Sequence, residues 1–224
     1  MDRPIAPAVR FFYRHLYNRL AFSYDAVSVM VSRGEWRAWA RSAIPFLQGP
    51  RVLEVACGTG SLEVDLYSRG FEPIGLDLSP FMLEQTRSKL RRSGHPAVLV
   101  RARVQMLPFR AASFDSLVMT FPPGFVTDEE AMQEMHRVLA PGGRLVWVDA
   151  PYLSPRDPWS RFLNWAYRLA NGGPLEEQSD EEPRREDRSS IQNWLPRNGW
   201  DWRVERIKMP ASEIHVLIAN KEAV

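Results

Sequence analysis

The sequence of 224 residues predicts an α/β protein built around one open, mostly parallel β-sheet whose last strand is antiparallel to the others. Two observations predict this fold class. Between residues 51 and 148, short apolar runs alternate with segments of helical spacing, a pattern typical of parallel strands joined by helices. Near the end of the chain, only a short turn separates two strand-like runs, so the second must run back along the first.

The sequence predicts helices before the first strand of the sheet and after each of its first two strands. Residues 8–24 place apolar side chains at helical spacing, and a second helical stretch runs from about residue 35 to residue 46. The first two buried strands are predicted at "RVLEVA" and "EPIGLDL", each followed by a helix. Ser79 and Pro80 are a typical N-cap and first residue for the second of these helices, which continues to about residue 92.

The second half of the chain completes the sheet. The third, fourth and fifth strands are predicted at "PAVLVRARV", "FDSLVMTF" and "RLVWVDA". The helix "DEEAMQEMHRVL" lies between the last two and ends at "APGG", where proline and glycine break it. The closing hairpin consists of "DWRVERIKM" and "SEIHVLIAN".

An irregular section separates the fifth strand from the hairpin. It begins with a predicted helix near residues 158–170 that carries an aromatic stripe. Residues 173–190 follow and are rich in charge and free of aromatic side chains. We expect this segment to be poorly ordered, or ordered only by contacts outside the fold, because it cannot bury enough apolar surface to offset the entropy of ordering.

Composition excludes several classes of function. Apolar residues make up 45% of the chain and charged residues 25%, with a net charge of +2, which is too balanced to indicate nucleic-acid binding. Cys57 is the only cysteine, so no intramolecular disulfide or cysteine-based metal site is expected. The four histidines lack metal-ligand spacing, so no metal is predicted. Without a long apolar run or a signal peptide, the protein is expected to be cytoplasmic.

The segment "VLEVACGTGSLEVDL", residues 52–66, has the form of a ligand-binding loop between a strand and a helix. A dinucleotide fingerprint requires a third glycine where this chain has Glu63, and a carboxylate there would repel a pyrophosphate. A phosphate-binding P-loop is excluded because no Lys-Ser/Thr pair follows the glycines. The ligand is therefore predicted to be a nucleoside without phosphates.

Two acidic residues narrow the choice of ligand. Glu54 and Asp77 lie at the carboxyl ends of the first and second predicted strands, which border the ligand crevice of a doubly wound sheet. The second carboxylate can accept hydrogen bonds from both ribose hydroxyls. The first, with the open backbone of "ACGTG", suits an ammonium and a sulfonium group. This combination predicts S-adenosylmethionine as the cofactor.

At this point the chain resembles a known family, the class I S-adenosylmethionine-dependent methyltransferases, and within it the branch of the ubiquinone/menaquinone C-methyltransferases. The resemblance covers roughly residues 22–220 and rests on four blocks in the right order: "VLEVACGTG", "IGLDLSPFMLEQTR", "MLPFRAASFDSLVMTF" and "EMHRVLAPGGRLVWVD". Upstream, "FSYDAVSVMVSRGEWRAW" is similar to the entry helix of that branch. The resemblance implies a Rossmann-like, doubly wound, mostly parallel seven-stranded sheet with an antiparallel C-terminal strand, plus N-terminal helices.

The resemblance also implies which residues contact the cofactor. In this sequence they are Tyr24, Glu54, Ala56, Cys57, Gly58, Thr59, Gly60, Asp77, Leu78, Met82, Val104, Gln105, Met106, Thr120 and Phe121. No unambiguous catalytic base is evident, and Tyr24 and His15 are the candidates.

Two residues depart from the family pattern. Ala56 replaces the usual first glycine, and since it is also small we expect little effect. Arg103 stands where many members have an aspartate that contacts the adenine amine, and arginine cannot accept that hydrogen bond. Adenine must then be held by backbone groups of residues 104–106 or by the Gln105 side chain.

We expect an N-terminal helical lid at residues 1–46 and a methyltransferase core at residues 47–224, with a lid helix and an acidic loop inserted at residues 151–190. The aromatic stripes at 8–24 and 158–170 would roof the pocket of a small lipophilic or aromatic acceptor. Arg10, Arg14 and Arg19 could then touch an anionic membrane surface.

Two alternatives stay open at this stage. A nucleic-acid methyltransferase would usually carry an extra binding module or a dense basic patch, and neither is visible. A non-catalytic cofactor-binding scaffold is compatible with the missing base and with Arg103.

Overall fold

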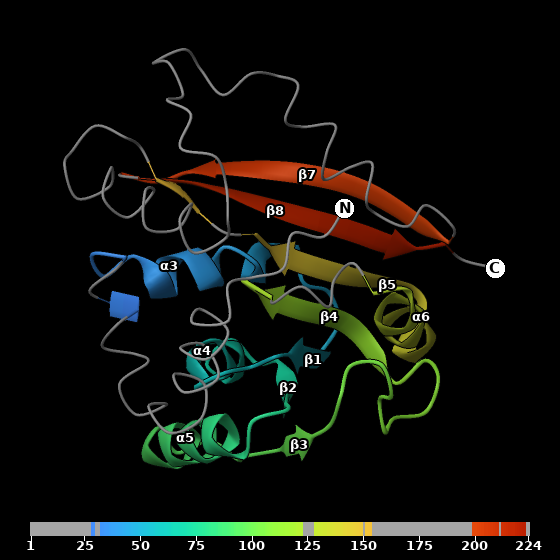
Figure 1. Cartoon of the computed structure of the whole chain (residues 1–224), viewed down its shortest axis with the longest axis horizontal. Helices are drawn as coiled ribbons and strands as arrows, with labels where there is room; N and C mark the ends of the chain where they lie inside the picture. The colour runs from blue at the N-terminus through green and yellow to red at the C-terminus, as the bar shows by residue number, and fades with distance from the viewer. Residues whose placement is uncertain are drawn as a thin grey trace, which may run out of the picture.

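The computed structural model describes residues 28–29, 32–122, 128–149, 151–153, 199–210 and 212–222. These residues form one sheet with the strand order β3-β2-β1-β4-β5-β8, and β7 pairs with the outer side of β8 (Figure 1). The strands are β1 (Arg51–Val55), β2 (Glu72–Asp77), β3 (Leu99–Arg101), β4 (Phe114–Thr120), β5 (Leu139–Val148), β6 (Tyr152–Leu153), β7 (Trp200–Lys208) and β8 (Ser212–Lys221). The helices are α3 (Trp36–Arg41), the 3₁₀ turn η1 (Ile44–Phe46), α4 (Ser61–Tyr67), α5 (Pro80–Arg92) and α6 (Glu129–Val138).

The strand directions confirm the fold class predicted from the sequence. Strands β1 to β5 pair in parallel, while β8 is antiparallel to β5 and to β7. The sheet has eight strands instead of the expected seven because of the two-residue β6. Glu213 of β8 pairs with Lys208 of β7 and also with Tyr152 of β6, so β6 lies on the same side of β8 as β5. The extra strand therefore adds no new position to the sheet.

Helices cover both faces of the sheet, as the doubly wound class requires. Side chains alternate along each central strand, so neighbouring residues such as Val52 and Leu53 enter different cores. One core packs α6 and the segment between β3 and β4 against the sheet, through Val104, Leu107, Met132, Met135 and Val138. The other packs α3, η1 and α4, through Trp39, Ala43, Ile44, Leu62 and Leu66.

Two arginines attach α3 to α4. Arg37 and Arg41 each place a guanidinium nitrogen 2.7 Å from a carboxylate oxygen of Asp65, which is almost wholly buried. Burial alone would raise the pKa of Asp65, but hydrogen bonds from Arg41 and Arg37 outweigh it and lower the pKa. The residues from Trp36 to Phe46, which fall inside the expected lid region, thus pack directly on the core of the sheet.

Local signals in the sequence account for where the helices begin. The Ser79 hydroxyl accepts a hydrogen bond from the backbone N–H of Met82 at 3.3 Å, and Pro80 follows as the first helical residue, which confirms the predicted cap of α5. Asp128 caps α6 in the same way, accepting from the Glu130 N–H at 3.1 Å.

Two elements are shorter than predicted. The third strand covers only Leu99–Arg101, because the chain then turns to place Val104 and Leu107 in a core. The helical stretch at residues 35–46 divides into α3 and η1, since Pro45 lacks the N–H needed to continue an α-helix.

The predicted helices at 8–24 and 158–170 and the charged segment at 173–190 lie outside the described residues. Within the residues that are described, no helix is both long enough and apolar enough to cross a membrane.

Candidate functional site

The carboxyl ends of β1, β2 and β4 meet at the point where the order of the strands in the sheet reverses. From β1 the chain continues to β2 on one side, whereas β4 pairs with the other side of β1. Ligands of open α/β sheets bind at such a switch point. The described residues predicted to contact the cofactor all belong to this edge of the sheet. One group lies at the end of β1 and in the loop that follows it, and a second lies at residues 77–82, from the last residue of β2 into α5. The others lie at residues 104–106 after β3 and at the end of β4. Tyr24 and His15 lie outside the described residues.

The loop after β1 has a strained and compact backbone. Ala56, Gly58 and Gly60 have φ angles of 57°, 55° and 74°, in the left-handed region. For Ala56 this conformation costs roughly 1–2 kcal/mol, which explains why a glycine would be the easier residue at this position. A Cβ added to Gly58 would meet nothing within 4 Å, so open space borders the loop there.

Asp77 connects this loop to the end of β2. Its carboxylate accepts hydrogen bonds from the backbone N–H of Gly58 at 3.0 Å and of Ser79 at 2.8 Å. Burial raises the pKa of Asp77, although the N–H groups of Ser79, Gly58 and Leu78 act in the opposite direction. A carboxylate has about four acceptor sites, so Asp77 retains capacity for hydroxyl donors of a ligand.

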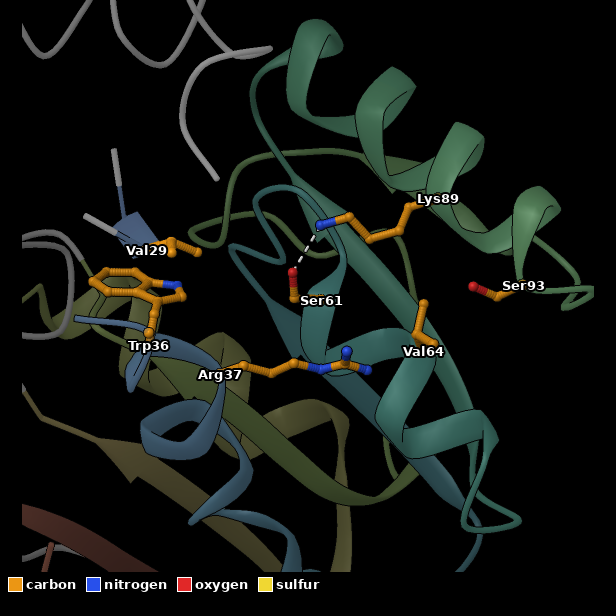
Figure 2. A pocket seen from close by; sticks show the side chains of 8 residues that line it. Val29, Trp36, Arg37, Ser61, Val64, Lys89 and Ser93 are labelled. Atoms are coloured by element: carbon orange, nitrogen blue, oxygen red, sulfur yellow. Dashed lines mark hydrogen bonds between the residues drawn. The ribbon is translucent and has the colours of Figure 1, made fainter. Parts of the chain in front are cut away.

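Side chains of α5 support the loop from the helical side. The Thr86 hydroxyl donates to the Gly58 carbonyl at 2.8 Å. The Lys89 ammonium donates to the hydroxyls of Thr59 at 3.1 Å and Ser61 at 2.7 Å, and Figure 2 shows it reaching from α5 to the first residue of α4. Sequence reasoning missed both residues, because their contacts depend on how α5 packs against the loop.

A cavity of about 340 Å³ lies beside this contact, between α3, α4 and α5 (Figure 2). Its lining includes Trp36, Arg37, Ser61, Val64 and Lys89. None of the predicted cofactor residues lines it. The residues with the expected chemistry therefore lie at the ends of the strands and not in this cavity.

Two large apolar side chains are exposed at this edge of the sheet. Leu78 after β2 is 59% exposed and Met106 after β3 is 79% exposed. Val104, in contrast, is buried in the core, so only its backbone can face a ligand. The Gln105 amide nitrogen donates to Asp128 at 2.7 Å, and the Met106 N–H donates to the Arg103 carbonyl at 3.1 Å. These two donors are therefore already engaged.

At the end of β4, Phe121 turns its ring away from the strand axis. Its φ is 50°, and its ring lies 4.5 Å from that of Trp36 and 6.3 Å from that of Trp39, measured between centroids. The side chain thus packs against α3, and only Thr120 and the Phe121 backbone stay at the strand end.

Two carboxyl groups are buried under the loop. Glu54 is 2% exposed and Glu63 is fully buried. One oxygen of Glu54 and both of Glu63 lack a hydrogen-bond partner among the described residues. Burial, followed by the charge of Glu63, raises the pKa of Glu54 well above its ordinary value. Burial also raises the pKa of Glu63 to about 8. From the sequence, Glu63 was interpreted only as an obstacle to a pyrophosphate.

The same burial governs Cys57. Burial, with added repulsion from Glu63, Glu54 and Asp77, raises the pKa of the thiol well above its ordinary value. The sulfur is therefore held as a thiol, which is a poor nucleophile. No cluster of three or more His, Cys, Asp or Glu suited to a metal ion occurs in the described part of the chain.

The buried carboxyl group of Glu63 gives a testable pH dependence. Because its pKa is higher in the folded chain than its ordinary value of 4.5, the folded state binds the extra proton and stability falls as the pH rises toward 8. Glu63→Gln removes this titration. Between pH 5 and pH 8, the wild type should lose more than about 1 kcal/mol of unfolding free energy relative to the variant, as measured by urea denaturation. Glu84→Gln, an exposed substitution on α5, should leave the pH profile unchanged, and parallel profiles for wild type and Glu63→Gln would contradict the assignment.

Comparison with known proteins agrees with this geometry. Residues 52–143, which include the loop, Asp77 and β4, match the methyltransferase domain family. A demethylmenaquinone methyltransferase of Symbiobacterium thermophilum is 31% identical over 166 residues, which cover 70% of this chain and 64% of that protein. The chain belongs to the class I S-adenosylmethionine-dependent methyltransferases. This confirms the family and the branch inferred from the motifs.

Other relatives of this chain fall in the same branch. A ubiquinone/menaquinone biosynthesis C-methyltransferase of an Enterobacter species is 35% identical over 153 residues, which cover 63% of this chain and 61% of that protein. The chain thus spans a little under two thirds of the length of these curated relatives.

Solved structures of methyltransferases share the fold. An S-adenosylmethionine-dependent methyltransferase of Thermotoga maritima aligns with a TM-score of 0.61 at 21% identity, covering 93% of this chain and 98% of that one. The magnesium protoporphyrin IX methyltransferase of Synechocystis with bound S-adenosylhomocysteine aligns with a TM-score of 0.51 at 18% identity, covering 91% and 84%. At these identities the likeness establishes the Rossmann-like fold.

Proposed function

We propose that this methyltransferase binds S-adenosylmethionine at the ends of β1, β2 and β4 and transfers the methyl group to a small lipophilic or aromatic acceptor. The observation that carries the proposal is the position of Asp77. Its carboxylate is fixed by the N–H groups of Gly58 and Ser79 beside the open space over Gly58. A carboxylate held there is suited to accept hydrogen bonds from the two ribose hydroxyls of a nucleoside.

The neighbouring residues fit the rest of the cofactor. The exposed side chains of Leu78 and Met106 offer apolar surfaces for the two faces of an adenine ring. Glu54, at the end of β1, is a buried carboxyl group whose ionised form the ammonium and sulfonium groups of the ligand would favour. Arg103 supplies no acceptor for the adenine amine, so backbone groups of residues 104–106 or the carbonyl oxygen of the Gln105 side chain would accept from it.

The chain's contribution to catalysis is positioning and exclusion of water. S-adenosylmethionine supplies a methyl group activated by its sulfonium. In-line transfer then requires that the acceptor be held close to that carbon in a dry pocket. Tyr24 and His15 are the candidates for direct contact with the acceptor. The proposal includes the predicted helices at 8–24 and 158–170 as the cover of the acceptor pocket.

The names of the relatives support the class of acceptor. Curated relatives methylate demethylmenaquinone or act in ubiquinone and menaquinone biosynthesis, according to their names. We therefore propose that the acceptor is a quinone-type small molecule. We also propose that the protein is cytoplasmic and has no nucleic-acid partner. Contact of the N-terminal basic residues with an anionic membrane would give access to such an apolar acceptor. Transfer of labelled methyl groups from S-adenosylmethionine to demethylmenaquinol would test the acceptor directly.

Replacement of Asp77 tests the cofactor site. Asp77→Ala should weaken binding of S-adenosylmethionine and S-adenosylhomocysteine by about 1–3 kcal/mol, or roughly 5- to 150-fold, because buried donors lose their acceptor. Titration calorimetry measures both ligands, with NAD as the comparison ligand that should bind less tightly. Asp201→Asn, an exposed carboxylate substitution on β7, is the matched control. An unchanged dissociation constant in folded Asp77→Ala, or tighter binding of NAD than of S-adenosylhomocysteine, would refute the proposal.

A further inference from the structure

Glu63 is a carboxyl group with no evident structural partner. It lies on the inner face of α4, three residues after Gly60, and is fully buried. Neither of its oxygens has a hydrogen-bond partner in the part of the chain that the structure describes. A Cβ added to Gly75 of β2 would lie 2.5 Å from one of these oxygens, so the absence of a side chain at Gly75 makes room for the carboxyl group. A buried polar group without a hydrogen-bond partner lowers the stability of the folded protein, so its presence here requires an explanation.

The groups around Glu63 are predominantly acidic. Glu54 of β1 is the register partner of Gly75, and a Cβ at Gly75 would meet both Glu63 and, at 3.1 Å, the sulfur of Cys57. The charge of Glu63 accordingly raises the pKa of Glu54 and Cys57, and also that of Tyr67 on its own helix. Asp77 and Asp65 add further negative charge near Glu54, and Lys89 of α5 is the cation that opposes them. Burial and mutual repulsion both disfavour ionisation of the two carboxyl groups together, and the charge of Lys89 offsets them only in part, so the pair Glu54 and Glu63 holds a proton in the ligand-free protein.

We propose that Glu63 makes the cofactor site distinguish the cationic cofactor from its demethylated product, through the proton that it holds jointly with Glu54. This inference rests on the proposed function. S-adenosylmethionine carries one more positive charge than S-adenosylhomocysteine, at the sulfonium. Binding of that charge beside Glu54 favours ionisation of the pair and releases the proton to solvent. After the methyl group has left, the thioether no longer offsets the second carboxylate, so the pair takes up a proton again and the product is held less tightly.

The consequence is a preference that depends on pH. At low pH the pair Glu54 and Glu63 tends to keep its proton with either ligand. The sulfonium is then attracted to a second carboxylate only if that proton is first displaced, which costs free energy. At high pH the pair loses its proton more readily, so S-adenosylmethionine, with its sulfonium, gains more binding free energy than S-adenosylhomocysteine, with its neutral thioether. The ratio of the dissociation constants of S-adenosylhomocysteine and S-adenosylmethionine should therefore increase with pH. Glu63→Gln removes one ionisable group of the pair but leaves Glu54, whose pKa is raised chiefly by burial, so the dependence of the ratio on pH should become weaker.

Titration calorimetry of both ligands from pH 6 to pH 9 tests the inference, in phosphate and in Tris buffers whose ionisation enthalpies differ. For the wild type we expect the ratio of the dissociation constants of S-adenosylhomocysteine and S-adenosylmethionine to rise at least 5-fold over this range. We also expect S-adenosylmethionine to release more protons on binding than S-adenosylhomocysteine does. Glu63→Gln should reduce both effects, whereas Glu84→Gln on the exposed side of α5 should retain them in full.

The outcomes separate this inference from the proposed function. A ratio that is flat across pH in the wild type, or a pH dependence that Glu63→Gln retains in full, would overturn the role of Glu63. The wild-type measurement decides the question even if the variant does not fold. If the wild type binds neither ligand, the proposed cofactor itself is wrong.

Discussion

Trp39→Ala is expected to lower the free energy of unfolding by about 3–5 kcal/mol, the range for removal of a large buried aromatic side chain. Trp39 is 2% exposed and belongs to the core between α3, α4 and the sheet. Its indole N–H donates to the Ser212 hydroxyl at 2.9 Å. That hydroxyl in turn donates to Glu35 at 3.0 Å, so one cluster connects α3 with the start of β8. Loss of the indole removes both the packing and the link between distant parts of the chain.

Urea denaturation measures this effect, and Trp39→Phe is the matched variant. Phenylalanine keeps most of the ring volume but cannot donate to Ser212, so it should lose the smaller amount of about 1–2 kcal/mol. Because Phe121 packs against Trp39 at the end of β4, Trp39→Ala should also weaken cofactor binding, while Trp39→Phe should not. A loss of less than about 1 kcal/mol for Trp39→Ala would show that α3 does not depend on this residue.

The parts of the fold that could be predicted are those encoded by neighbouring residues. Alternating apolar runs located the strands β1, β2 and β4, and the pair Ser79–Pro80 located the start of α5. The antiparallel pairing of β7 and β8 followed from the shortness of their connection. In each case the signal lies within a few residues along the chain, where propensity and turn chemistry act.

The unpredicted features depend on residues that are far apart in sequence. The hydrogen bond between Trp39 and Ser212 joins positions 173 residues apart, and the one between Lys89 and Ser61 depends on the packing of α5 against the loop. The burial of Glu63 likewise requires the small residue Gly75 on a neighbouring strand. No local pattern marks such contacts, because each is created only when the elements pack.

The location of the predicted site residues in the fold follows from the sequence, whereas their contacts do not. The edge that gathers Asp77, the glycine loop and the end of β4 follows from the order of strands and loops in the sequence. The direction of individual side chains does not follow. Phe121 packs toward α3, Val104 enters the core, and the Gln105 amide nitrogen binds Asp128.

Gly60→Ala should be among the most damaging single substitutions in the loop. Gly60 has a φ of 74°, and an added Cβ would lie 2.4 Å from Cγ2 of Thr86 and 2.9 Å from its Cβ. Thr86 is fully buried and cannot move away, because its hydroxyl is held by the carbonyls of Gly58 at 2.8 Å and Met82 at 3.0 Å. The left-handed backbone contributes about 1–2 kcal/mol and the overlap about 1–3 kcal/mol, so a total loss of roughly 2–5 kcal/mol is expected.

Two further variants separate the backbone effect of Gly60→Ala from the overlap with Thr86. Gly70→Ala has a similar φ of 81° and meets nothing within 4 Å, so it should lose only the backbone contribution of about 1–2 kcal/mol. Thr86→Ser removes Cγ2 but keeps the hydroxyl that binds Gly58, and in combination with Gly60→Ala it should restore part of the lost stability and of the cofactor affinity. Urea denaturation and calorimetry on this double-mutant cycle give the coupling between the two positions. If Gly60→Ala were no less stable than Gly70→Ala, or if Thr86→Ser gave no rescue, the contact between α5 and the loop would not control the shape of the site.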